Sequence, residues 1–495
     1  MEGRPVRHVV IAGGGTAGWT VAAALAKQLG ALIEITLVES DMIGTVGVGE
    51  STIPTVRRFH ELLAIDEREF VRETQASFKL GISFEDWSRI GDRYFHAFGV
   101  TGQGTWMADF QHMWLHARKQ GLAGDFGDYC FELRAAQAGK FLGGKDTHLN
   151  YAYHLDATAY GQYLRRFAEP LGVKRVEGKI ADVRLAGENG FIEALVLESG
   201  EEIAGELFID CTGFRALLIE GALETGYDDW TRWLPTDSAL AVQTDAVGPA
   251  KPYTRAIAHK AGWRWQIPLQ TRVGNGLVFC SRHLSDDAAR ALLAESVEGE
   301  MLTEPRLIRF RAGSRRKAWN RNCLAVGLAS GFVEPLESTS IHSIMIAVTR
   351  LMQMFPFGGV SEAVSRRFNE ISKRELEGIR DFIILHYHLT QRDEPFWREC
   401  RTMEVPDSLA ERIALFRESA QAYQAPDELF RTDSWVQVML GQGLEPRSHH
   451  EFARLMRPEQ LQGALASIAR NIDAAVAALP PHQAFLDNYR TSAGK

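Results

Sequence analysis

The stretch VVIAGGGTAG at residues 9–18 decides the fold. Four apolar residues lead into spaced glycines, and an alanine-rich run over 21–29 and an apolar run over 33–38 follow. This order predicts a strand, a glycine turn, a helix and a second strand. The glycines allow a tight turn, a close approach of backbone to a pyrophosphate, and close packing of helix on strand. The three glycines are, in that order, Gly13, Gly15 and Gly18.

An acidic residue completes this pattern. Glu39 lies about 20 residues past the glycines, at the end of the second predicted strand, where a carboxylate can accept hydrogen bonds from an adenosine ribose. The same carboxylate would repel a 2′-phosphate, which disfavours NADP. A glycine turn that binds no ligand is the alternative, but strand, helix and acidic residue all fall in register. We therefore predict a dinucleotide-binding α/β module.

Composition sets wider limits. The chain has 495 residues, 45% hydrophobic and 24% charged, and 55 Lys+Arg against 63 Asp+Glu give a net charge of −8. This mildly acidic balance offers no basic face for nucleic acid. The five cysteines are far apart without a CxxC spacing, which predicts reduced thiols in a cytoplasmic protein. The apolar run near the N-terminus is too short for a signal peptide, and no membrane span is expected.

Beyond the glycine turn the chain alternates between patterns. Residues 66–123 have a mixed, largely helical pattern rich in aromatic residues, which predicts an insertion that builds a pocket. Residues 174–209 and 238–311 read mostly as strands. A short buried strand at 323–327 precedes a loop and a helix that begins near Ser340, and the chain after Gly358 is helical. No flexible linker is expected.

Histidines do not predict a metal site. His112 and His116 have the i, i+4 spacing of two ligands on one helix, but no Glu follows His112 as HExxH requires. The doublets His386/His388 and His449/His450 are better explained as structural or solvent-facing residues. We expect no metal.

The loop over 327–340, GLASGFVEPLESTS, is more informative. Small residues let its backbone approach a ring system closely. Thr339 and Ser340 are predicted to cap the following helix and to place N–H groups toward an anion. The position suits a halide or the oxygen-reactive face of a flavin. A simple strand-to-helix connection is the alternative at this point.

Further motifs accompany the glycine turn. They are Gly47-Val48-Gly49-Glu50-Ser51-Thr52-Ile53-Pro54, Lys79, Trp263-x-Trp265-x-Ile267-Pro268 and Glu334-Pro335-Leu336-Glu337-Ser338-Thr339. Together these motifs closely resemble the flavin-dependent tryptophan halogenases. The resemblance runs from Ile11 to about Pro446 and includes the segment 379–388. Its most specific element is WxWxIP, the family's signature.

The resemblance implies an α/β fold with two modules. Residues 1–357 would form an FAD-binding, two-motif Rossmann-like module of the aromatic monooxygenase type with a mixed β-sheet. Its helical insertion at about 60–125 would contribute to the substrate pocket. Residues 358–495 would form a largely helical substrate module. A separate flavin reductase would supply reduced FAD, and the protein would act as a monomer or homodimer.

The resemblance also implies a reaction and residue roles. Reduced FAD and O2 give a flavin C4a-hydroperoxide, chloride or bromide attacks it, and hypohalous acid travels to a lysine beside a small aromatic substrate. Lys79 would hold the oxidant, Glu337 would orient it and stabilise the cationic ring intermediate, and Thr339 and Ser340 would bind halide. The family commonly has Gly where Ser340 stands. The FAD-binding residues would be Gly13, Gly15, Thr16, Ala17, Gly18, Glu39, Val48, Gly213, Leu328, Leu336 and Ile341.

Substrate recognition follows the family less closely. His96 and Phe98 resemble its aromatic wall, Phe430 would replace a stacking tryptophan, and Ser434 is assigned to the same site. No partner for the amino and carboxyl groups of tryptophan stands out, so we expect indole or an indole derivative. The signature residues Trp263, Trp265, Ile267 and Pro268 would keep substrate from the flavin.

Two alternative functions stand beside the halogenase prediction. An FAD-dependent aromatic hydroxylase is the main alternative, and a flavin-binding protein without catalysis is a weaker one.

Overall fold

The computed structural model describes residues 5–42, 49–144 and 147–491. The chain folds into two compact units, each built from three separate segments. Unit 1 comprises Met1–Ala76, Leu155–Arg232 and Arg309–Leu376, and unit 2 comprises Ser77–His154, Trp233–Ile308 and Glu377–Lys495. The predicted boundary between residues 357 and 358 would separate two functional modules rather than two compact units. It stays a prediction.

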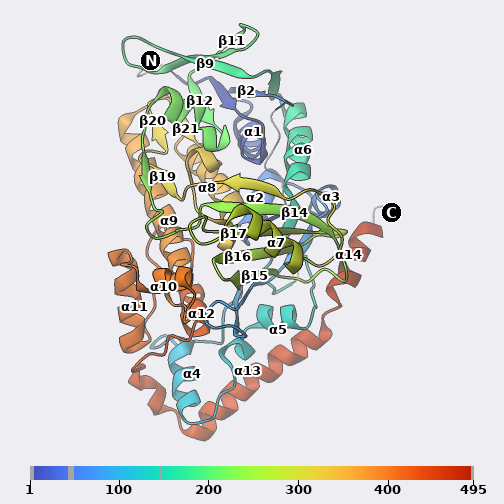
Figure 1. Cartoon of the computed structure of the whole chain (residues 1–495), viewed down its shortest axis with the longest axis vertical. Coiled ribbons are helices and arrows are strands. Elements are labelled where there is room, and N and C mark those ends of the chain that lie inside the picture. The colour runs from blue at the N-terminus through green and yellow to red at the C-terminus, as the bar shows by residue number, and fades with distance from the viewer. Residues whose placement is uncertain (1–4, 43–48, 145–146, 492–495) are drawn as a thin grey trace. The chain divides into compact units, whose positions relative to one another are not determined.

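A six-stranded mixed sheet forms the centre of unit 1. Its order is β20-β21-β12-β1-β2-β8, and all strands except the antiparallel edge strand β20 run parallel. Figure 1 labels four of these strands, β20, β21, β12 and β2. The strands are β1 (His8–Ala12), β2 (Glu34–Glu39), β8 (Lys174–Glu177), β12 (Leu207–Asp210), β20 (Trp319–Asn320) and β21 (Cys323–Ala325). Helix α1 (Thr16–Leu29) connects β1 to β2, which confirms the predicted strand, turn, helix and strand.

Burial explains the continuous apolar runs in this sheet. Helices α6 (Ala157–Ala168) and α8 (Ser340–Gln353) pack against α1, and the apolar residues of β1 are fully buried. Helix α8 begins at Ser340, as predicted. Unit 1 also contains β3 (Gly49–Ser51), α2 (Thr55–Leu63), α3 (Glu67–Glu73), β9 (Ile180–Leu185), β10 (Ile192–Leu197), β11 (Glu202–Ala204), β13 (Tyr227–Asp229), β19 (Gly313–Arg315) and β22 (Gly331–Phe332).

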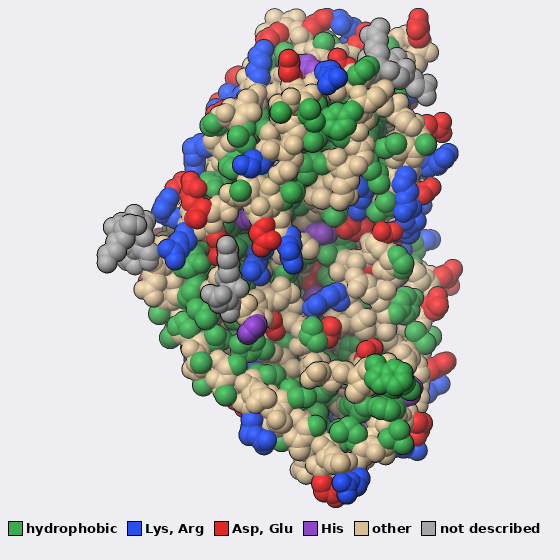
Figure 2. All heavy atoms as spheres, turned by 180° about the vertical axis from the view of Figure 1, so that it is seen from behind, with side chains coloured by type: hydrophobic (Ala, Val, Ile, Leu, Met, Phe, Trp, Pro, Cys, Tyr) green, Lys and Arg blue, Asp and Glu red, His purple; other side chains and the backbone are tan. Residues whose placement is uncertain are grey.

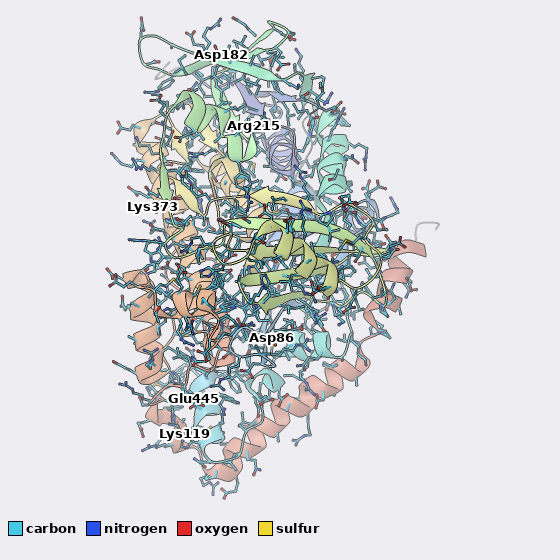
Figure 3. All side chains as sticks on the ribbon, in the orientation of Figure 1. Asp86, Lys119, Asp182, Arg215, Lys373 and Glu445 are labelled. Atoms are coloured by element: carbon cyan, nitrogen blue, oxygen red, sulfur yellow. The ribbon has the colours of Figure 1, made fainter. Side chains whose placement is uncertain are left out.

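A seven-stranded sheet forms the centre of unit 2, in the order β18-β14-β17-β16-β15-β5-β6. Its strands are β5 (Gly81–Glu85), β6 (Arg93–Ala97), β14 (Ser238–Asp245), β15 (Thr254–His259), β16 (Gly262–Pro268), β17 (Arg272–Phe279) and β18 (Arg306–Arg309). The strands predicted over 238–311 are therefore present, with one unpredicted helix, α7 (Asp286–Ser296). In Figure 3 the label Asp86 marks the turn that follows β5.

The predicted insertion at 60–125 is less helical than expected. Besides the end of α2, helix α3 and helix α4 (Phe110–Lys119), it contains β5, β6 and the short strand β4 (Ser77–Lys79). Strand β4 pairs with β7 (Ala152–Asp156), and β5 pairs with β15, a strand far away along the chain. Strands β4 and β5 have distant partners, which a local pattern does not reveal, whereas β6 pairs with its neighbour β5. Helix α5 (Phe131–Gln137) follows.

The chain after Gly358 is helical, as predicted. Its helices are α9 (Glu362–His388), α10 (Pro395–Thr402), α11 (Asp407–Ser419), α12 (Thr432–Gly441), α13 (Pro458–Ala478) and α14 (His482–Thr491).

No helix among the described residues is long and apolar enough to cross a membrane. All five cysteines are buried thiols. On the face in Figure 2, basic side chains lie among acidic ones.

Candidate active site

Glycines shape the carboxyl edge of the unit 1 sheet. Gly13 has a φ of +100°, and a side chain there would collide with the carbonyl of Cys211. A side chain at Gly18 would collide with the carbonyl of Gly13, so helix α1 packs closely on the turn. At Gly15 a Cβ would meet nothing within 4 Å, so this position borders open space. The tight turn therefore lies at Gly13, the open space at Gly15 and the close packing of helix on turn at Gly18, as predicted for these three positions.

The start of α1 suits an anionic group. Gly15 is the N-cap of α1, and no side chain caps the helix there. The first-turn N–H groups, those of Thr16, Ala17 and Gly18, are therefore available to an anion such as a diphosphate. The turn η3 (Gly213–Arg215) follows the neighbouring strand β12, and its Arg215 is labelled in Figure 3. Gly213 has a φ of +69° and open space at its Cβ position. This edge of the sheet fits a dinucleotide.

Glu39 is held rigidly at the end of β2. Its Oε1 accepts a hydrogen bond of 2.6 Å from Nε of Arg175, and its Oε2 accepts one of 3.3 Å from the indole N–H of Trp19. A side chain at Gly14 would collide with the Glu39 carboxylate, which gives this fourth glycine a steric role that the sequence did not suggest. The carboxylate is thus fixed beside the glycine turn.

The loop after β21 brings a second set of residues to unit 1. Leu328 is half-buried in η5 (Gly327–Ala329), and Leu336 and Ile341 are buried near the start of α8. Glu337 in η6 (Pro335–Glu337) is only 1% exposed, as is Glu334. A Cβ at Gly327 would lie 3.1 Å from Cβ of Ala17, so this loop adjoins the start of α1. Val48 lies outside the described residues.

One detail of this loop differs from the prediction. Thr339 is the N-cap residue of α8, but its side chain makes no capping hydrogen bond. Ser338 adopts a left-handed conformation with a φ of +60°, and Thr339 itself has helical rather than extended dihedrals. A capping hydroxyl needs the extended conformation to reach the N–H groups of the first turn. The side-chain cap predicted at Thr339 is therefore wrong, and only backbone N–H groups start this helix.

Lys79 occupies a dry position in unit 2. Its side chain is 0% exposed on β4, and Nζ lies 5.1 Å from the ring centroid of Phe98. Phe98 is fixed because its N–H donates to the carbonyl of Leu80. An ammonium over an aromatic face is stabilised most when water is excluded. A lysine is usually at the surface. The complete burial of Lys79 is therefore unusual.

Aromatic side chains gather in the same unit. Phe430 stacks on Phe382 with ring centroids 3.8 Å apart, and the ring of His96 lies 6.0 Å from Phe430 and 5.4 Å from Phe382. The predicted residues His96, Phe98 and Phe430 thus share unit 2 with Lys79. Phe382 was not singled out from the sequence, because nothing in its helical pattern distinguishes it from a core residue.

Helix α12 holds this aromatic wall in place. Its Gln437 accepts a hydrogen bond from the N–H of Ala97 at 2.8 Å and donates one to the carbonyl of Gly99 at 3.3 Å. Both ends of the segment around Phe98 are therefore tied to one side chain. Ser434 is also on α12, and it is buried. No sequence motif points to Gln437.

The WxWxIP residues form β16 inside the unit 2 sheet. Trp263 and Trp265 are buried, as are Ile267 and Pro268, and the two indoles have ring centroids 6.0 Å apart. Trp265 lies directly opposite Gly276 of β17, and any side chain at Gly276 would collide with the Trp265 ring. The signature tryptophans are therefore held by the sheet.

A buried histidine of the last helix secures the strand that carries Lys79. His482 on α14 donates from Nδ1 to the carbonyl of Ala250 at 2.7 Å, and its Nε2 accepts from the N–H of Phe78 at 3.2 Å. This pair of bonds requires the neutral ring. Burial lowers the pKa of His482 to about 4, against the hydrogen bond to Ala250, which raises it.

Stability should consequently depend on this histidine. The unfolded chain binds the proton near pH 6.5 and the folded chain only near pH 4. Neutral His482 therefore makes its full contribution to the free energy of unfolding above pH 6.5. This contribution, about 3 kcal/mol in all, is lost as the pH falls toward 4. We expect His482→Gln, which can donate and accept in the same places without titrating, to lose less stability than wild type between about pH 7.5 and pH 5. Urea unfolding at both pH values measures this, and equal losses would contradict it.

The histidines of α4 make other contacts. Nδ1 of His112 accepts from the N–H of His450, and Nδ1 of His116 lies 3.2 Å from Nε2 of His449. Across the described residues, no group of three or more His, Cys, Asp or Glu side chains is placed to hold a metal ion.

Comparisons with known proteins place these features in context. A family model described as tryptophan halogenase matches residues 8–458. The tryptophan 7-halogenase of Lentzea aerocolonigenes is 35% identical, over 95% of this chain and 97% of that protein. Among solved structures, a flavin-dependent halogenase of Xanthomonas campestris is 53% identical with a TM-score of 0.97, over 98% of this chain and 99% of that one. A second, from Brevundimonas, is 44% identical with a TM-score of 0.94 and the same coverage.

Proposed function

Because this chain belongs to the tryptophan halogenase family and is a flavin-dependent halogenase, we propose that it installs chloride or bromide on indole or an indole derivative. The observation that carries this proposal is Lys79, a fully buried ammonium beside an aromatic wall. Such a site can hold a small electrophilic oxidant against a flat aromatic ring.

The carboxyl edge of the unit 1 sheet would hold FAD. The turn Gly13–Gly18, with Thr16 and Ala17, would bind the diphosphate, and Glu39 the ribose. Gly213, Leu328, Leu336 and Ile341 would line the ring site, as the open space at Gly213 and the loop beside α1 support. When bound in reduced form, FAD supplies with O2 the oxidising power that converts halide to hypohalous acid. A separate flavin reductase would deliver the reduced FAD.

Backbone groups at the start of α8 would bind the halide. Thr339 and Ser340 provide N–H groups at a helix N-terminus, where an anion is favoured. The absence of a side-chain cap at Thr339 supports this role, because a capping hydroxyl would compete for those N–H groups.

Lys79 would hold the hypohalous acid. An ammonium can donate a hydrogen bond to the oxygen of hypohalous acid, which directs the halogen at one ring carbon. Alternatively, a neutral amine can form a haloamine with release of water. Both routes need the nitrogen fixed beside the ring, and complete burial and the contact with Phe98 support this.

Glu337 would stabilise the charge that develops on the substrate. Attack by an aromatic carbon on the halogen leaves a positive charge on the ring, and a carboxylate in a dry site stabilises that charge strongly. The 1% exposure of Glu337 supports this role. The same carboxylate can accept the proton that the ring must lose to regain aromaticity.

The substrate proposal rests on charged side chains that are already engaged. Between residues 428 and 433, Glu428 pairs with Arg412, Arg431 donates to the carbonyl of Phe98, and Asp433 accepts from the N–H of Thr101. These hydrogen bonds to the fold use part of the capacity of each group, which supports a substrate without the charged amino and carboxyl groups of tryptophan. Burying those groups without partners costs several kcal/mol.

We therefore expect kcat/KM for indole to exceed that for tryptophan by about tenfold or more. A reaction with equal concentrations of both substrates measures the ratio directly from the two halogenated products. A preference for tryptophan would contradict the substrate proposal but would leave the halogenase assignment intact.

Halide dependence tests the reaction class. The protein, reduced FAD from a generic flavin reductase, O2 and indole are incubated with and without bromide. We expect product only with bromide, although flavin oxidation continues in both. An aromatic hydroxylase would form its product equally well without halide, and that result would replace our proposal.

A further inference from the structure

A buried hydrogen-bond chain runs behind Lys79. Strand β4 has only three residues, and it pairs with β7 so that Ser77 lies opposite His154 and Lys79 opposite Ala152. Because side chains alternate along a strand, Ser77 and Lys79 project from one face of β4 and Phe78 from the other. His154 shares the face of Ser77, since directly opposed residues project to the same side. The imidazole therefore stands on the same face as the Lys79 side chain.

The hydrogen-bond partners determine which group donates and which accepts in each of these hydrogen bonds. Oγ of Ser77 donates to the carbonyl of Pro268 at 2.5 Å, so it can only accept from His154. Nδ1 of His154 lies 3.1 Å from that oxygen and must carry the proton. Nε2 of His154 then accepts from the hydroxyl of Thr254, 2.9 Å away on β15. These hydrogen bonds thus link separate segments of unit 2 through the one neutral ring of His154.

The surroundings keep that ring neutral. His154 is completely buried, and burial, with the nearby Lys79 and His482, holds its pKa well below the ordinary value, although the carbonyl of Pro268 acts in the opposite direction. A neutral imidazole can donate at one nitrogen and accept at the other, as this chain requires. No other side chain of similar size combines these two functions in one rigid ring.

We propose that His154 is a positioning residue for halogenation, which sets the place of Lys79 through Ser77 and ties it to Pro268 of the WxWxIP strand. The proposal rests on the proposed function. A three-residue strand has few backbone hydrogen bonds, so the hydrogen bonds of Ser77 and His154 constrain β4 further, in addition to the bond from the N–H of Phe78 to His482. Displacing a reactive group by about 1 Å can cost a hundredfold in rate.

The expected defect is a loss of coupling rather than a loss of oxidant. The proposed FAD residues lie in unit 1, so a change at His154 should leave flavin oxidation and halide oxidation intact. Hypohalous acid that a misplaced Lys79 fails to hold would escape to solvent. The measured quantities are therefore halogenated indole per FAD oxidised, and hypohalous acid caught by a soluble trap.

Two substitutions at this position separate positioning from packing. His154→Phe keeps the ring but removes both hydrogen bonds, whereas an amide nitrogen in His154→Asn can still donate to Ser77. We expect His154→Phe to lower the coupling ratio by about tenfold or more, with a matching rise in trapped oxidant, and His154→Asn to stay within about threefold of wild type. FAD affinity should be unchanged in both.

His60→Phe is the control, because His60 is a buried histidine of unit 1 that contacts the hydroxyl of Tyr160. The coupling ratio of this variant should equal that of wild type.

Defined results would overturn the proposal. One is normal coupling in His154→Phe; another is an equal fall in His154→Phe and His154→Asn, which would indicate packing alone. If His154→Phe does not fold, Ser77→Ala carries the test, because it removes the hydroxyl that accepts from His154 and donates to the carbonyl of Pro268; unchanged coupling there would overturn the proposal. Wild-type enzyme that forms no halogenated product would contradict the proposed function itself, whereas productive wild type with equally coupled variants contradicts only the role of His154.

Discussion

Lys79→Met lowers the rate of halogenated product formation by about a thousandfold or more, in our expectation, while FAD binding stays at the wild-type level. Methionine preserves the length and apolar stem of the side chain, so the buried site remains filled. It removes the nitrogen that donates to hypohalous acid or accepts the halogen. The proposed FAD-binding residues belong to unit 1 and Lys79 to unit 2, so flavin oxidation should continue without transfer to indole.

Lys140→Met is the matched control for this result. Lys140 is a partly buried lysine of unit 2, and its Nζ donates to the carbonyls of Val476 and Ala477 at the end of α13. Its loss should lower thermal stability and leave product formation unchanged. Product yield and flavin oxidation are measured together by chromatography and absorbance. If Lys79→Met still halogenated within about tenfold of wild type, Lys79 would have no direct role.

Glu337→Gln should slow product formation by about a hundredfold to a thousandfold without loss of fold or FAD binding. The amide has the same shape and keeps an acceptor oxygen, but it lacks the negative charge that stabilises the cationic ring intermediate. In a site this dry the charge has a large effect, because little water screens it. Single-turnover rates with preformed reduced FAD separate this step from flavin supply.

Glu334→Gln is the control here. Glu334 lies in the same loop and is as fully buried as Glu337. If the effect depends on position, the loss should be much larger at Glu337. Equal losses in the two variants would indicate that both carboxylates merely support the loop, and an unchanged rate in Glu337→Gln would remove its charge from the reaction.

The sequence predicted the parts of this molecule that depend on local chemistry. A glycine turn between an apolar strand and an alanine-rich helix has one common structural outcome, and Gly13 and Gly18 indeed leave no room for a side chain. The start of α8 at Ser340 follows from small and polar residues ahead of an apolar helical pattern. In such segments the residue type itself restricts the backbone.

The parts that depend on distant partners were not predictable in this way. Strand β4 exists because residues 77–79 pair with β7, so its pattern alone suggested part of a helical insertion. Thr339 follows Ser338, which has a positive φ, and has helical dihedrals itself, so the predicted side-chain cap does not form. His154 and His482 carry no motif. Their importance becomes visible only when the fold places them beside Ser77 and Phe78.

The measurement that tests our central claim most directly is mass spectrometry of the indole product formed with bromide, reduced FAD and O2, for wild type beside Lys79→Met. We predict that wild type gives indole in which bromine replaces one hydrogen, with the paired isotope peaks of bromine, and that Lys79→Met gives none while it oxidises FAD at the same rate. An indole product that has gained oxygen, or equal bromination by Lys79→Met, would contradict the claim that a buried lysine directs halogen to the substrate.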